Sequence, residues 1–420
     1  MIVGIIGSGG REHAICAKIK ESLKISKIFC IPGNAGTKNI AENIDIKIDD
    51  FKSIKDFCIK SKMDLLIVGP EQPLVDGIVD YMEGSKVKVF GPNKIASQLE
   101  GSKIFTKKIC KKYKIPTANF KIFENLNEAK EFLTNSKYPI VIKADGLAAG
   151  KGVYICKNYA EGEIAAKEIF SGKFGIAKKL LVEEFLSGEE MSYFIICDGK
   201  DYKFFGTAQD HKRVGEGDRG KNTGGMGCYS PSRLFTSELE EKINKKIVKP
   251  TLNAINDLGT TYKGFLYVGL MIKDNEPYLV EFNVRMGDPE CQTILPLLKS
   301  DLFEIFYSCC IGSLNKTEVE LSNKKSICIV LCSIGYPEEY KKDVEIQNLE
   351  NLVIKENENI FHAGTKSKNN EILASGGRVL NFVSKSNNFK KSREDVINLI
   401  NKLNWKEGFF RKDIGYKVID

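Results

Sequence analysis

Short apolar runs that end in glycine are the feature that most constrains the fold of this chain. Met1–Gly7 is such a run, and Arg11–Lys20 follows it with the spacing of a helix. Further β-rich runs lie at Ser26–Ile31, Met63–Val68 and Val87–Phe90, and Gly-Pro closes the last two. The order strand, glycine, helix, strand predicts an open parallel α/β sheet, with ligand-binding loops at the carboxyl ends of its strands.

The whole chain is too long for one ordinary hydrophobic core. Its 420 residues predict several domains. We expect mixed α/β and α+β units: the parallel sheet, two units that mix strands and helices, and a small β-rich unit. Their expected bounds are 1–101, 102–190, 191–325 and 326–420. The expected strands after the first unit are 120–123, 139–143, 152–155, 180–184, 191–198, 202–209, 265–273, 277–282, 326–332, 360–363 and 376–383, and the expected helices are 103–114, 237–257, 290–311 and 393–403.

Composition and charge disfavour several classes of protein. Hydrophobic residues make up 42% and charged residues 28%, which is typical of a globular protein. The net charge of +8 comes from scattered lysines, so we expect no nucleic-acid partner. No apolar run reaches the roughly 18 residues of a membrane span, and the start MIVGIIGSGG is unlike a signal peptide. Twelve cysteines in mostly apolar surroundings favour a cytoplasmic protein with reduced thiols, and three histidines disfavour a histidine metal site.

Gly7-Ser8-Gly9-Gly10 follows the first predicted strand and is the first candidate site. Backbone N–H groups at a helix N-terminus could hold a phosphate there, and a tight turn without a ligand is the alternative. The dinucleotide fingerprint is not met, because Glu12 stands at its third glycine position. In addition, Cys30-Ile31-Pro32 ends the second strand where that fingerprint has an acidic ribose ligand. A nicotinamide enzyme is therefore disfavoured.

Asp145–Gly152 (DGLAAGKG) joins two predicted strands through small residues. Such a hairpin flap could close over a polyphosphate, with Lys151 adding positive charge and Lys143 pointing a second cation at the same space. It is not a P-loop, because Lys151 is followed by glycine where Ser or Thr is required. An ordinary glycine-rich hairpin is the alternative.

Acidic residues surround a strand end in LVEEFLSGEE (181–190). The backbone after Glu183 and Glu184 could meet the edge of an adenine ring, and Glu190 could bind ribose hydroxyls. A solvated acidic edge is the alternative.

Tyr278–Glu290 (YLVEFNVRMGDPE) is the most informative stretch. Glu281 and Asn283 are two apart on a predicted strand and therefore share one face. A carboxylate and an amide oxygen suit Mg²⁺, which takes further ligands from water and phosphates. Arg285 is expected to continue that face, where it could stabilise a transferring phosphoryl group or hold an anionic substrate. A structural salt bridge is the alternative.

Ala208–Gly227 begins with AQDHKR and continues as a polar, glycine-rich loop expected to lack secondary structure. Asp210 could hold an ammonium group or orient an amine, and Lys212 and Arg213 could bind phosphate or carboxylate. For His211 two roles stay open, general base and anchor of the loop. Together the lysines, the flap and the Glu281 strand predict a ligase that activates a carboxylate with ATP and joins it to an amine.

These motifs resemble the phosphoribosylamine–glycine ligase family of the ATP-grasp superfamily. The matching stretches are GSGGREHA, PGNAGT, VGPEQPL, VIKADGLAAGKGV, LVEEFLSGEEMS, AQDHKR, NTGGMGCYSP, EFNVRMGDPE, HAGT and SGGRVL, from the first residues to the last segment. The lysine, flap and EFNVR motifs are general to ATP-grasp enzymes, whereas GSGGREHA and AQDHKR with NTGGMG are specific to this family. Gln209, where we expect a charged residue, is a mild departure.

The resemblance implies a two-lobed ATP-grasp module with ATP between residues 102–190 and 191–325. Lysines would reach the phosphates, Glu183 and the backbone near Phe185 would contact adenine, and Glu190 would hold the ribose. The implied ATP-binding residues are Lys103, Lys143, Gly150, Lys151, Gly152, Glu183, Glu184, Phe185, Leu186 and Glu190.

The same resemblance implies the reaction and its other ligands. Glycine would be joined to 5-phosphoribosylamine through glycyl phosphate, in purine biosynthesis. Glu281 and Asn283 would bind Mg²⁺ or Mn²⁺. Gly9, Gly10 and Glu71 would contact phosphoribosylamine, Asp210, Lys212 and Arg285 would face the reacting centre, and Arg285, Lys143 and Asp210 would be catalytic. We expect small-molecule partners only, no membrane partner, and a monomer or weak homodimer.

Three rival interpretations remain open to test. The first is another ATP-grasp ligase, such as a carboxylase of biotin or of aminoimidazole ribonucleotide, although AQDHKR with NTGGMG is not expected there. The second is a nucleotide sensor without catalysis, which the intact Lys143, Glu281, Asn283 and Arg285 disfavour. The third is a dehydrogenase, which the missing ribose acid disfavours.

Overall fold

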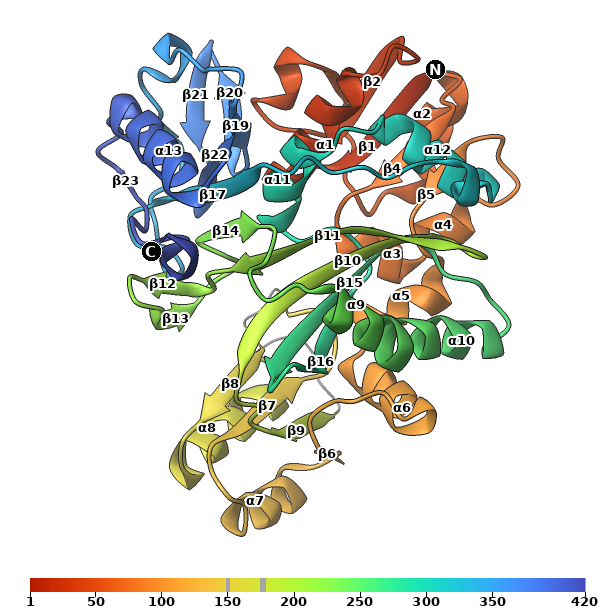
Figure 1. Cartoon of the computed structure of the whole chain (residues 1–420), viewed down its shortest axis with the longest axis vertical. Coiled ribbons are helices and arrows are strands. Elements are labelled where there is room, and N and C mark those ends of the chain that lie inside the picture. The colour runs from red at the N-terminus through yellow and green to blue at the C-terminus, as the bar shows by residue number, and fades with distance from the viewer. Residues whose placement is uncertain (149–151, 174–178, 420) are drawn as a thin grey trace.

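The computed structural model describes residues 1–148, 152–173 and 179–419. Within these residues the strands form five sheets. Figure 1 shows the N-terminal unit (red to orange) and the C-terminal segment (blue) side by side at one end of the molecule, with the lobe that holds β6 to β9 at the other end.

The N-terminal unit is a parallel sheet in the order β3-β2-β1-β4-β5. Its strands are β1 (Ile2–Gly7), β2 (Lys27–Pro32), β3 (Glu42–Asn43), β4 (Leu65–Val68) and β5 (Lys88–Phe90), and its helices are α1 (Gly10–Lys20), η1 (Thr37–Asn39), α2 (Phe51–Lys60), α3 (Glu71–Asp76), α4 (Ile78–Tyr81) and α5 (Lys94–Gly101). The chain runs from β1 to β2 on one side and returns to β4 on the other. The loops after β1 and β4 therefore meet at a switch point, where ligands bind in such sheets.

The second lobe is an antiparallel sheet in the order β6-β9-β7-β8. Its elements are α6 (Lys103–Tyr113), β6 (Phe120–Phe123), α7 (Leu126–Thr134), β7 (Ile140–Ala144), β8 (Val153–Cys156), α8 (Tyr159–Phe170) and β9 (Leu180–Glu184). Ser102 caps the start of helix α6, because its side chain accepts a hydrogen bond from the N–H of Phe105, and the C-cap residue Lys114 has positive φ. This cap fixes Lys103 in the first turn, beside the loop that follows β7.

One continuous sheet, called here the long sheet, joins the third and fourth segments of the chain. Its order is β16-β15-β10-β11-β14-β17-β22-β19, with β23 on β17. Its strands are β10 (Glu189–Asp198), β11 (Tyr202–Asp210), β14 (Gly227–Ser230), β15 (Lys263–Lys273), β16 (Glu276–Asn283), β17 (Lys325–Ser333), β19 (Glu358–His362), β22 (Arg378–Ser386) and β23 (Gly408–Phe409). Because β14 pairs with β17, the sheet continues across the division expected at residue 325.

The predicted helix over 290–311 is broken in the structure. It divides into α11 (Glu290–Ile294), η3 (Leu295–Leu297) and α12 (Leu302–Ile311). Pro296 cannot donate a helical hydrogen bond, and Asp301 caps a new helix by accepting from the N–H groups of Phe303 and Glu304. The predicted helix over 237–257 is continuous, as α9 (Ser237–Ile243), a π turn η2 (Asn244–Val248) and α10 (Lys249–Asp257).

The C-terminal segment contacts the N-terminal unit through two buried histidines. His362 on β19 donates its backbone N–H to Nδ1 of His13 on α1, at 2.8 Å. Asn34, in the loop after β2, donates to the carbonyl oxygens of both Ser8 and His362. The remaining elements of the segment are β18 (Val344–Glu345), η5 (Leu349–Asn351), β20 (Thr365–Lys368), β21 (Glu371–Ala374), α13 (Phe389–Leu403) and η6 (Tyr416–Val418), and η4 (Leu314–Lys316) precedes the segment.

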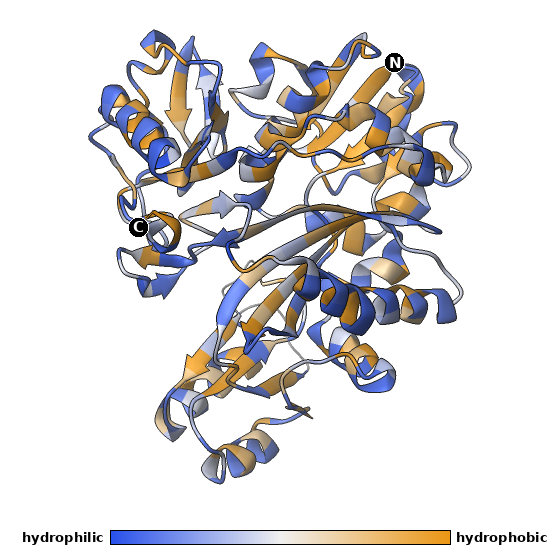
Figure 2. Ribbon diagram, viewed as in Figure 1, coloured by the Kyte–Doolittle hydropathy of each residue, from blue (hydrophilic) through white to orange (hydrophobic). Residues whose placement is uncertain are grey.

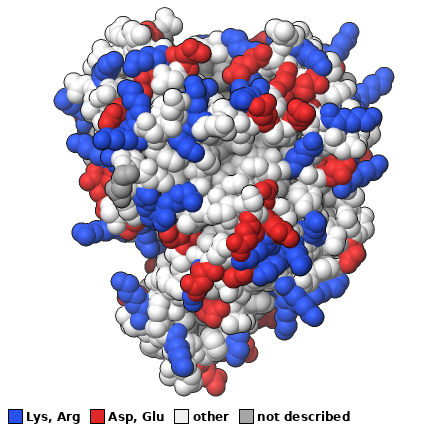
Figure 3. All heavy atoms as spheres, viewed as in Figure 1, with Lys and Arg blue, Asp and Glu red and all other residues white. Residues whose placement is uncertain are grey.

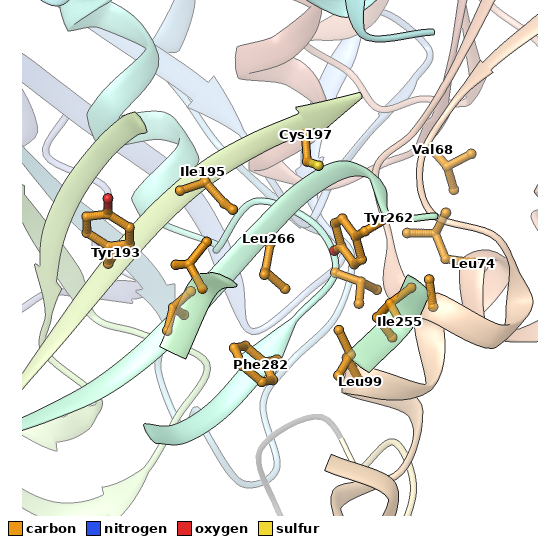
Figure 4. Packing of buried hydrophobic residues seen from close by; sticks show 14 of the residues in the cluster. Val68, Leu74, Leu99, Tyr193, Ile195, Cys197, Ile255, Tyr262, Leu266 and Phe282 are labelled. Carbon is orange, nitrogen blue, oxygen red and sulfur yellow. The ribbon is translucent and has the colours of Figure 1, made fainter. Parts of the chain in front are cut away.

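The largest apolar cluster crosses the boundary between the N-terminal unit and the long sheet. Figure 4 shows Val68 and Leu74 of the N-terminal unit on one side of Tyr262, and Leu266 of β15 on the other; all belong to this cluster. In Figure 2 the hydrophobic colour follows the strands, whereas the helices carry hydrophilic outer faces. Lys and Arg are interspersed with Asp and Glu over the face seen in Figure 3. Within the described residues no helix is both long and apolar enough to cross a membrane.

Candidate active site

The predicted metal-binding pair lies on β16, at the junction of the two lobes. Glu281 pairs with Gly269 of β15, and Asn283 pairs with Tyr267. Burial raises the pKa of the Glu281 carboxyl, but nearby positive charges outweigh burial and hold that pKa below its ordinary value. These charges belong to Lys212, Lys143, Lys103 and Arg285, in decreasing order of effect. The carboxylate is therefore ionised and surrounded by cations.

Glu281 and Asn283 fit a divalent cation by the chemistry of their oxygens. Among the described residues neither side chain is engaged in an ion pair or a hydrogen bond, so both oxygens can accept a ligand. The described part of the chain contains no cluster of three or more His, Cys, Asp or Glu side chains that could hold a metal ion. A site with few protein ligands suits Mg²⁺, which fills its shell with water and phosphate oxygens.

Two predicted phosphate-binding lysines come from the second lobe toward this strand. Lys143 on β7 donates its Nζ to the carbonyl oxygen of Val280, at 3.4 Å, directly beside Glu281. Lys103 donates its Nζ to the carbonyl oxygen of Gly146, at 2.8 Å, in the loop after β7. The structure thus brings together the predicted phosphate cations and the predicted metal ligands.

Glu183 lies between two lysines at the end of β9. Its carboxylate is 3.1 Å from Nζ of Lys143 and 3.3 Å from Nζ of Lys107, and only 5% of its side chain is exposed. Lys107 also donates to Oγ1 of Thr117, at 2.6 Å. Sequence reasoning missed Lys107, although it stands one helical turn after Lys103 and could have been found by that spacing. Contact of Glu183 with adenine stays a prediction.

The other predicted nucleotide residues occupy the edges of this lobe. Glu184 accepts hydrogen bonds from the backbone and side chain of Asn119, at 3.0 and 3.1 Å. Phe185 is 42% exposed, and Leu186 beside it is partly buried. Gly152 closes the flap hairpin by accepting from the N–H of Ala144. Gly150 and Lys151 lie outside the described residues.

The glycine loop after β1 is filled by the carboxylate of Glu12. The N–H of Gly9, predicted to lie near a phosphate, donates to Oε2 of Glu12 at 2.7 Å. A Cβ on Gly7 or on Gly69 would come within 2.5 Å of the Glu12 side chain, so both glycines are required by close approach. Glu12 was noted in the sequence as a failed fingerprint position, and its role in packing this loop was missed.

Gly10 is packed from the other side. A Cβ there would lie 2.2 Å from Nδ2 of Asn381 and 2.7 Å from Nε2 of Gln292. The glycine therefore allows α1 to approach β22 and α11 closely. Phosphate binding at Gly9 and Gly10 stays a prediction.

Arg285 lies past the end of β16 and bridges to the N-terminal unit. The expectation that it continues the strand face is wrong, because the strand ends at Asn283 and the N–H of Val284 donates to Glu100. The Arg285 guanidinium donates to Glu71 at 3.1 Å and to Glu100 at 2.6 Å. Its charge lowers the pKa of Glu71 to about 2, whereas burial raises the pKa of Glu100 to about 7. Glu100 was missed, since nothing in the sequence links it to Arg285.

The stretch after β11 is more ordered than expected. It contains the hairpin β12 (Arg213–Gly215) and β13 (Arg219–Asn222), so the prediction of a loop without secondary structure is wrong. His211 anchors this hairpin: its Nε2 accepts from the N–H of Gly415 at 3.1 Å, and its Nδ1 lies 3.3 Å from Asp218. Of the two roles left open for His211, these contacts favour the anchor.

Lys212 and Glu190 meet across the site. The Lys212 Nζ is 2.7 Å from Oε2 of Glu190, which the sequence assigned to a ribose. Gln209 is buried and donates to the carbonyl oxygen of Glu190, while its own oxygen accepts from Tyr229 and Ser232. Gln209, where a charged residue was expected, thus has a structural role: it binds the backbone of Glu190.

Comparison with known proteins covers nearly the whole chain. Models of phosphoribosylglycinamide synthetase match residues 1–100 (N domain), 101–291 (ATP-grasp domain) and 326–417 (C domain). The phosphoribosylamine–glycine ligase of Caldanaerobacter subterraneus subsp. tengcongensis is 44% identical over 419 residues, covering 99% of each chain. The chain belongs to the phosphoribosylglycinamide synthetase family. The resemblance stated from the motifs is confirmed.

Solved structures separate this family from its wider fold. The phosphoribosylamine–glycine ligase of Thermotoga maritima has a TM-score of 0.83 at 32% identity, with 98% of this chain and 100% of that one covered. The biotin carboxylase domain of the Hydrogenobacter thermophilus 2-oxoglutarate carboxylase has a TM-score of 0.72 at 17% identity over 95% of this chain and 89% of that one, which shows the fold alone. The predicted fold class is confirmed, and membership of this ATP-grasp family implies use of ATP and a divalent metal ion.

Proposed function

We propose that the chain ligates glycine to 5-phosphoribosylamine, converting ATP to ADP and phosphate and yielding glycinamide ribonucleotide in purine biosynthesis. The observation that carries the proposal is the bond from Lys143 to the carbonyl oxygen of Val280. It brings a phosphate-binding cation of one lobe beside the ionised Glu281 and the amide of Asn283 on the other. Such an arrangement suits a nucleoside triphosphate whose γ-phosphoryl group lies at the lobe junction.

The chemistry requires two displacements. An oxygen of the glycine carboxylate attacks the γ-phosphorus of ATP, and the bond from that phosphorus to the ADP oxygen breaks, giving glycyl phosphate. The amine nitrogen of 5-phosphoribosylamine then attacks the glycyl carbonyl carbon and loses a proton, while the carbonyl–oxygen bond to phosphate breaks. The protein contributes mainly position and charge in such transfers.

Several side chains would share these tasks. Lys103 and Lys143 would neutralise the phosphates of ATP, and Glu281 with Asn283 would hold a divalent cation that, when bound, offsets the charge of the phosphates. The phosphoribosylamine would lie at the switch point of the N-terminal sheet, near Glu71. There the ion pair between Glu71 and Arg285, at 3.1 Å, would link the substrate to the reacting centre.

Phosphate release with ATP, glycine and 5-phosphoribosylamine tests the proposal, with the product identified by mass. Release must depend on both glycine and the amine, and the product mass must be that of glycinamide ribonucleotide. ATP turnover with bicarbonate and none with glycine would instead assign a carboxylase. Tight ATP binding without turnover in the presence of both substrates would assign a nucleotide sensor.

We further propose Mg²⁺ or Mn²⁺ as the metal, the cytoplasm as the location, and a monomer or weak homodimer that binds no nucleic acid or membrane. Activity titrated with each metal and light scattering of the purified chain check the first and third of these statements.

A further inference from the structure

Glu100 lies where the N-terminal unit, the second lobe and the long sheet meet. It is the last residue but one of α5, and the chain passes from there directly into α6 of the second lobe. Only 7% of its side chain is exposed, yet both of its oxygens have donors. Oε1 accepts from Nη2 of Arg285 at 2.6 Å, and Oε2 accepts from the backbone N–H of Val284 at 2.8 Å. The carboxylate therefore fixes both a side chain and a stretch of backbone just past the end of β16.

Arg285 pairs with two carboxylates that differ in their access to solvent. The side chain of Glu71 is 28% exposed, whereas that of Glu100 is 7% exposed. Burial lowers the pKa of Arg285, but the charge of Glu100 and, to a smaller extent, that of Glu71 outweigh burial and raise this pKa above its ordinary value. Glu100 is thus the stronger and more enclosed partner, and Glu71 is the partner that a ligand can reach.

The residues that follow carry one of the predicted phosphate-binding lysines, Lys103. On one side of it, Ser102 donates from Oγ to Oδ1 of Asp145 at 3.0 Å, and on the other the N–H of Ile104 donates to the same oxygen at 3.1 Å. Asp145 begins the loop after β7, so this stretch is held against the base of the predicted flap. The segment 100–104 therefore contacts the end of β16 at its start and the flap loop at its end.

We infer that Glu100 is a positioning residue of the ligase: it holds the Arg285 guanidinium in one orientation and in register with Lys103. This inference rests on the proposed function, in which Arg285 faces the reacting centre. A guanidinium donates from a rigid plane, so a carboxylate fixed at Nη2 also sets the direction of the N–H groups that remain. Because Glu100 is enclosed, it keeps Arg285 in place even when Glu71 turns to a bound phosphoribosylamine.

A purely structural tie between α5 and β16 is the alternative role for Glu100. Loss of such a tie would lower the stability of the chain and worsen the kinetic constants together. Loss of a positioning contact acts mainly on the transfer step, because a misplacement of about 1 Å can lower a rate about 100-fold while binding is kept. The ratio of the effects on kcat and KM therefore separates the two roles.

Glu100→Gln tests the inference, because the amide keeps the shape of the side chain but offers an acceptor oxygen to only one of the two donors. At saturating glycine and 5-phosphoribosylamine we expect kcat to fall about 30-fold, while the KM for ATP changes by less than about threefold. Glu358→Gln is the matched control. Glu358 is also buried, accepts the backbone N–H of Lys355 at 3.0 Å and pairs with the ammonium of Lys355 at 3.4 Å. It lies on β19, away from the site, and its substitution should leave kcat unchanged.

A double variant shows whether Glu100 acts through Arg285. Arg285→Lys replaces the planar fork of donors by a single ammonium, so the group that Glu100 orients is already lost. Adding Glu100→Gln to this variant should lower kcat by less than about threefold further. If the losses of the two single variants instead multiply in full, the residues act independently and the inference is overturned.

Glu100→Asp carries the test if the thermal midpoint shows that the glutamine variant does not fold. It keeps the charge but withdraws the carboxylate by one methylene, so kcat should still fall about fivefold with the KM for ATP held. A kcat within about twofold of the wild type in a folded Glu100 variant would overturn the inference. An equal fall of kcat in Glu358→Gln, or a parallel worsening of kcat and the KM for ATP, would overturn it too.

The wild type separates this inference from the proposed function. If the wild-type chain makes glycinamide ribonucleotide, any of these contrary results overturns the positioning role alone and leaves the proposed function standing. A wild-type chain that does not turn over glycine with 5-phosphoribosylamine and ATP overturns both.

Discussion

The contact between His13 and His362 should make the stability of the chain depend on pH between neutral and mildly acid conditions. Burial, and to a smaller extent the charge of His362, lower the pKa of His13 to about 3. Burial lowers the pKa of His362 to about 4. Both residues are only 7% exposed, so solvent does little to screen the effect. Both histidines are therefore neutral in the folded chain at neutral pH.

The sign and size of this pH dependence follow from the difference in histidine pKa between the folded and unfolded states. An unfolded histidine has a pKa of about 6.5 and takes up a proton as the pH falls, whereas the folded one does not. The stabilisation is thus complete above about pH 6.5 and is lost as the pH falls toward the folded values. At about pH 5 each histidine favours the unfolded state by roughly 2 kcal/mol, or roughly 4 kcal/mol together. That is a large share of typical stability.

The single tryptophan provides the assay. Trp405 lies in the C-terminal segment and donates its indole N–H to the carbonyl oxygen of Glu345, so its fluorescence reports unfolding of that segment. Urea unfolding is compared at about pH 7.5 and about pH 5 for the wild type, His13→Asn, His362→Asn and the double variant. Asparagine can keep an acceptor where His13 Nδ1 accepts the backbone N–H, without the titration. Each single variant should lose about half of the pH dependence.

The refuting result concerns the difference between the two pH values, because the cost of each substitution at neutral pH cancels in it. If the double variant loses as much stability on acidification as the wild type, protonation of this pair is not the cause, and other groups carry the acid sensitivity.

Three further predictions concern the site. Glu281→Gln should lower turnover by at least roughly 100-fold without lowering the thermal midpoint, because it removes a metal ligand and not core volume; wild-type activity at limiting Mg²⁺ would contradict this. Gly225→Ala should lower kcat/KM for glycine by roughly tenfold or more, because a Cβ there would lie 2.8 Å from Oδ1 of Asp210. Gly259→Ala should not lower it, since Gly259 has positive φ but no atom near its Cβ. Equal effects of the two substitutions would make backbone strain the cause. Lys107→Met should raise the KM for ATP about tenfold, because the ion pair with Glu183 is lost. Lys108→Met, at an exposed lysine, should leave the KM unchanged. Equal KM values for the two variants would show that Lys107 takes no part in nucleotide binding.

Local sequence patterns predicted the strands and helices well where the sequence itself marks the ends of an element. The strands at Phe120–Phe123 and Leu180–Glu184 have the predicted bounds. Polar residues, Glu124 and Asn125, follow the first strand directly. The broken helix after Glu290 was missed because Pro296 and the cap at Asp301 compete with a continuous apolar periodicity. The fold class and the family are confirmed, whereas the roles of individual site residues stay predictions.

Residues whose roles depend on distant partners could not be predicted. Glu100 accepts a hydrogen bond from Arg285, which lies 185 positions away in the sequence, and no local pattern predicts that contact. Lys107 differs, since its spacing from Lys103 was visible on the predicted helix. Glu12 was seen only as a mismatch to a motif, because the sequence does not show that Gly69 lies against its side chain.

The pairing of β14 with β17 has a consequence for handling pieces of this protein. A fragment that stops at residue 325 would leave β14 with an open row of backbone donors and acceptors, and the complementary fragment would leave β17 in the same condition. Exposed strand edges recruit other strands, so either fragment made alone should self-associate. When the two fragments are made together, β14 of one can pair with β17 of the other. Complementation in trans then becomes a practical way to label one half of the enzyme.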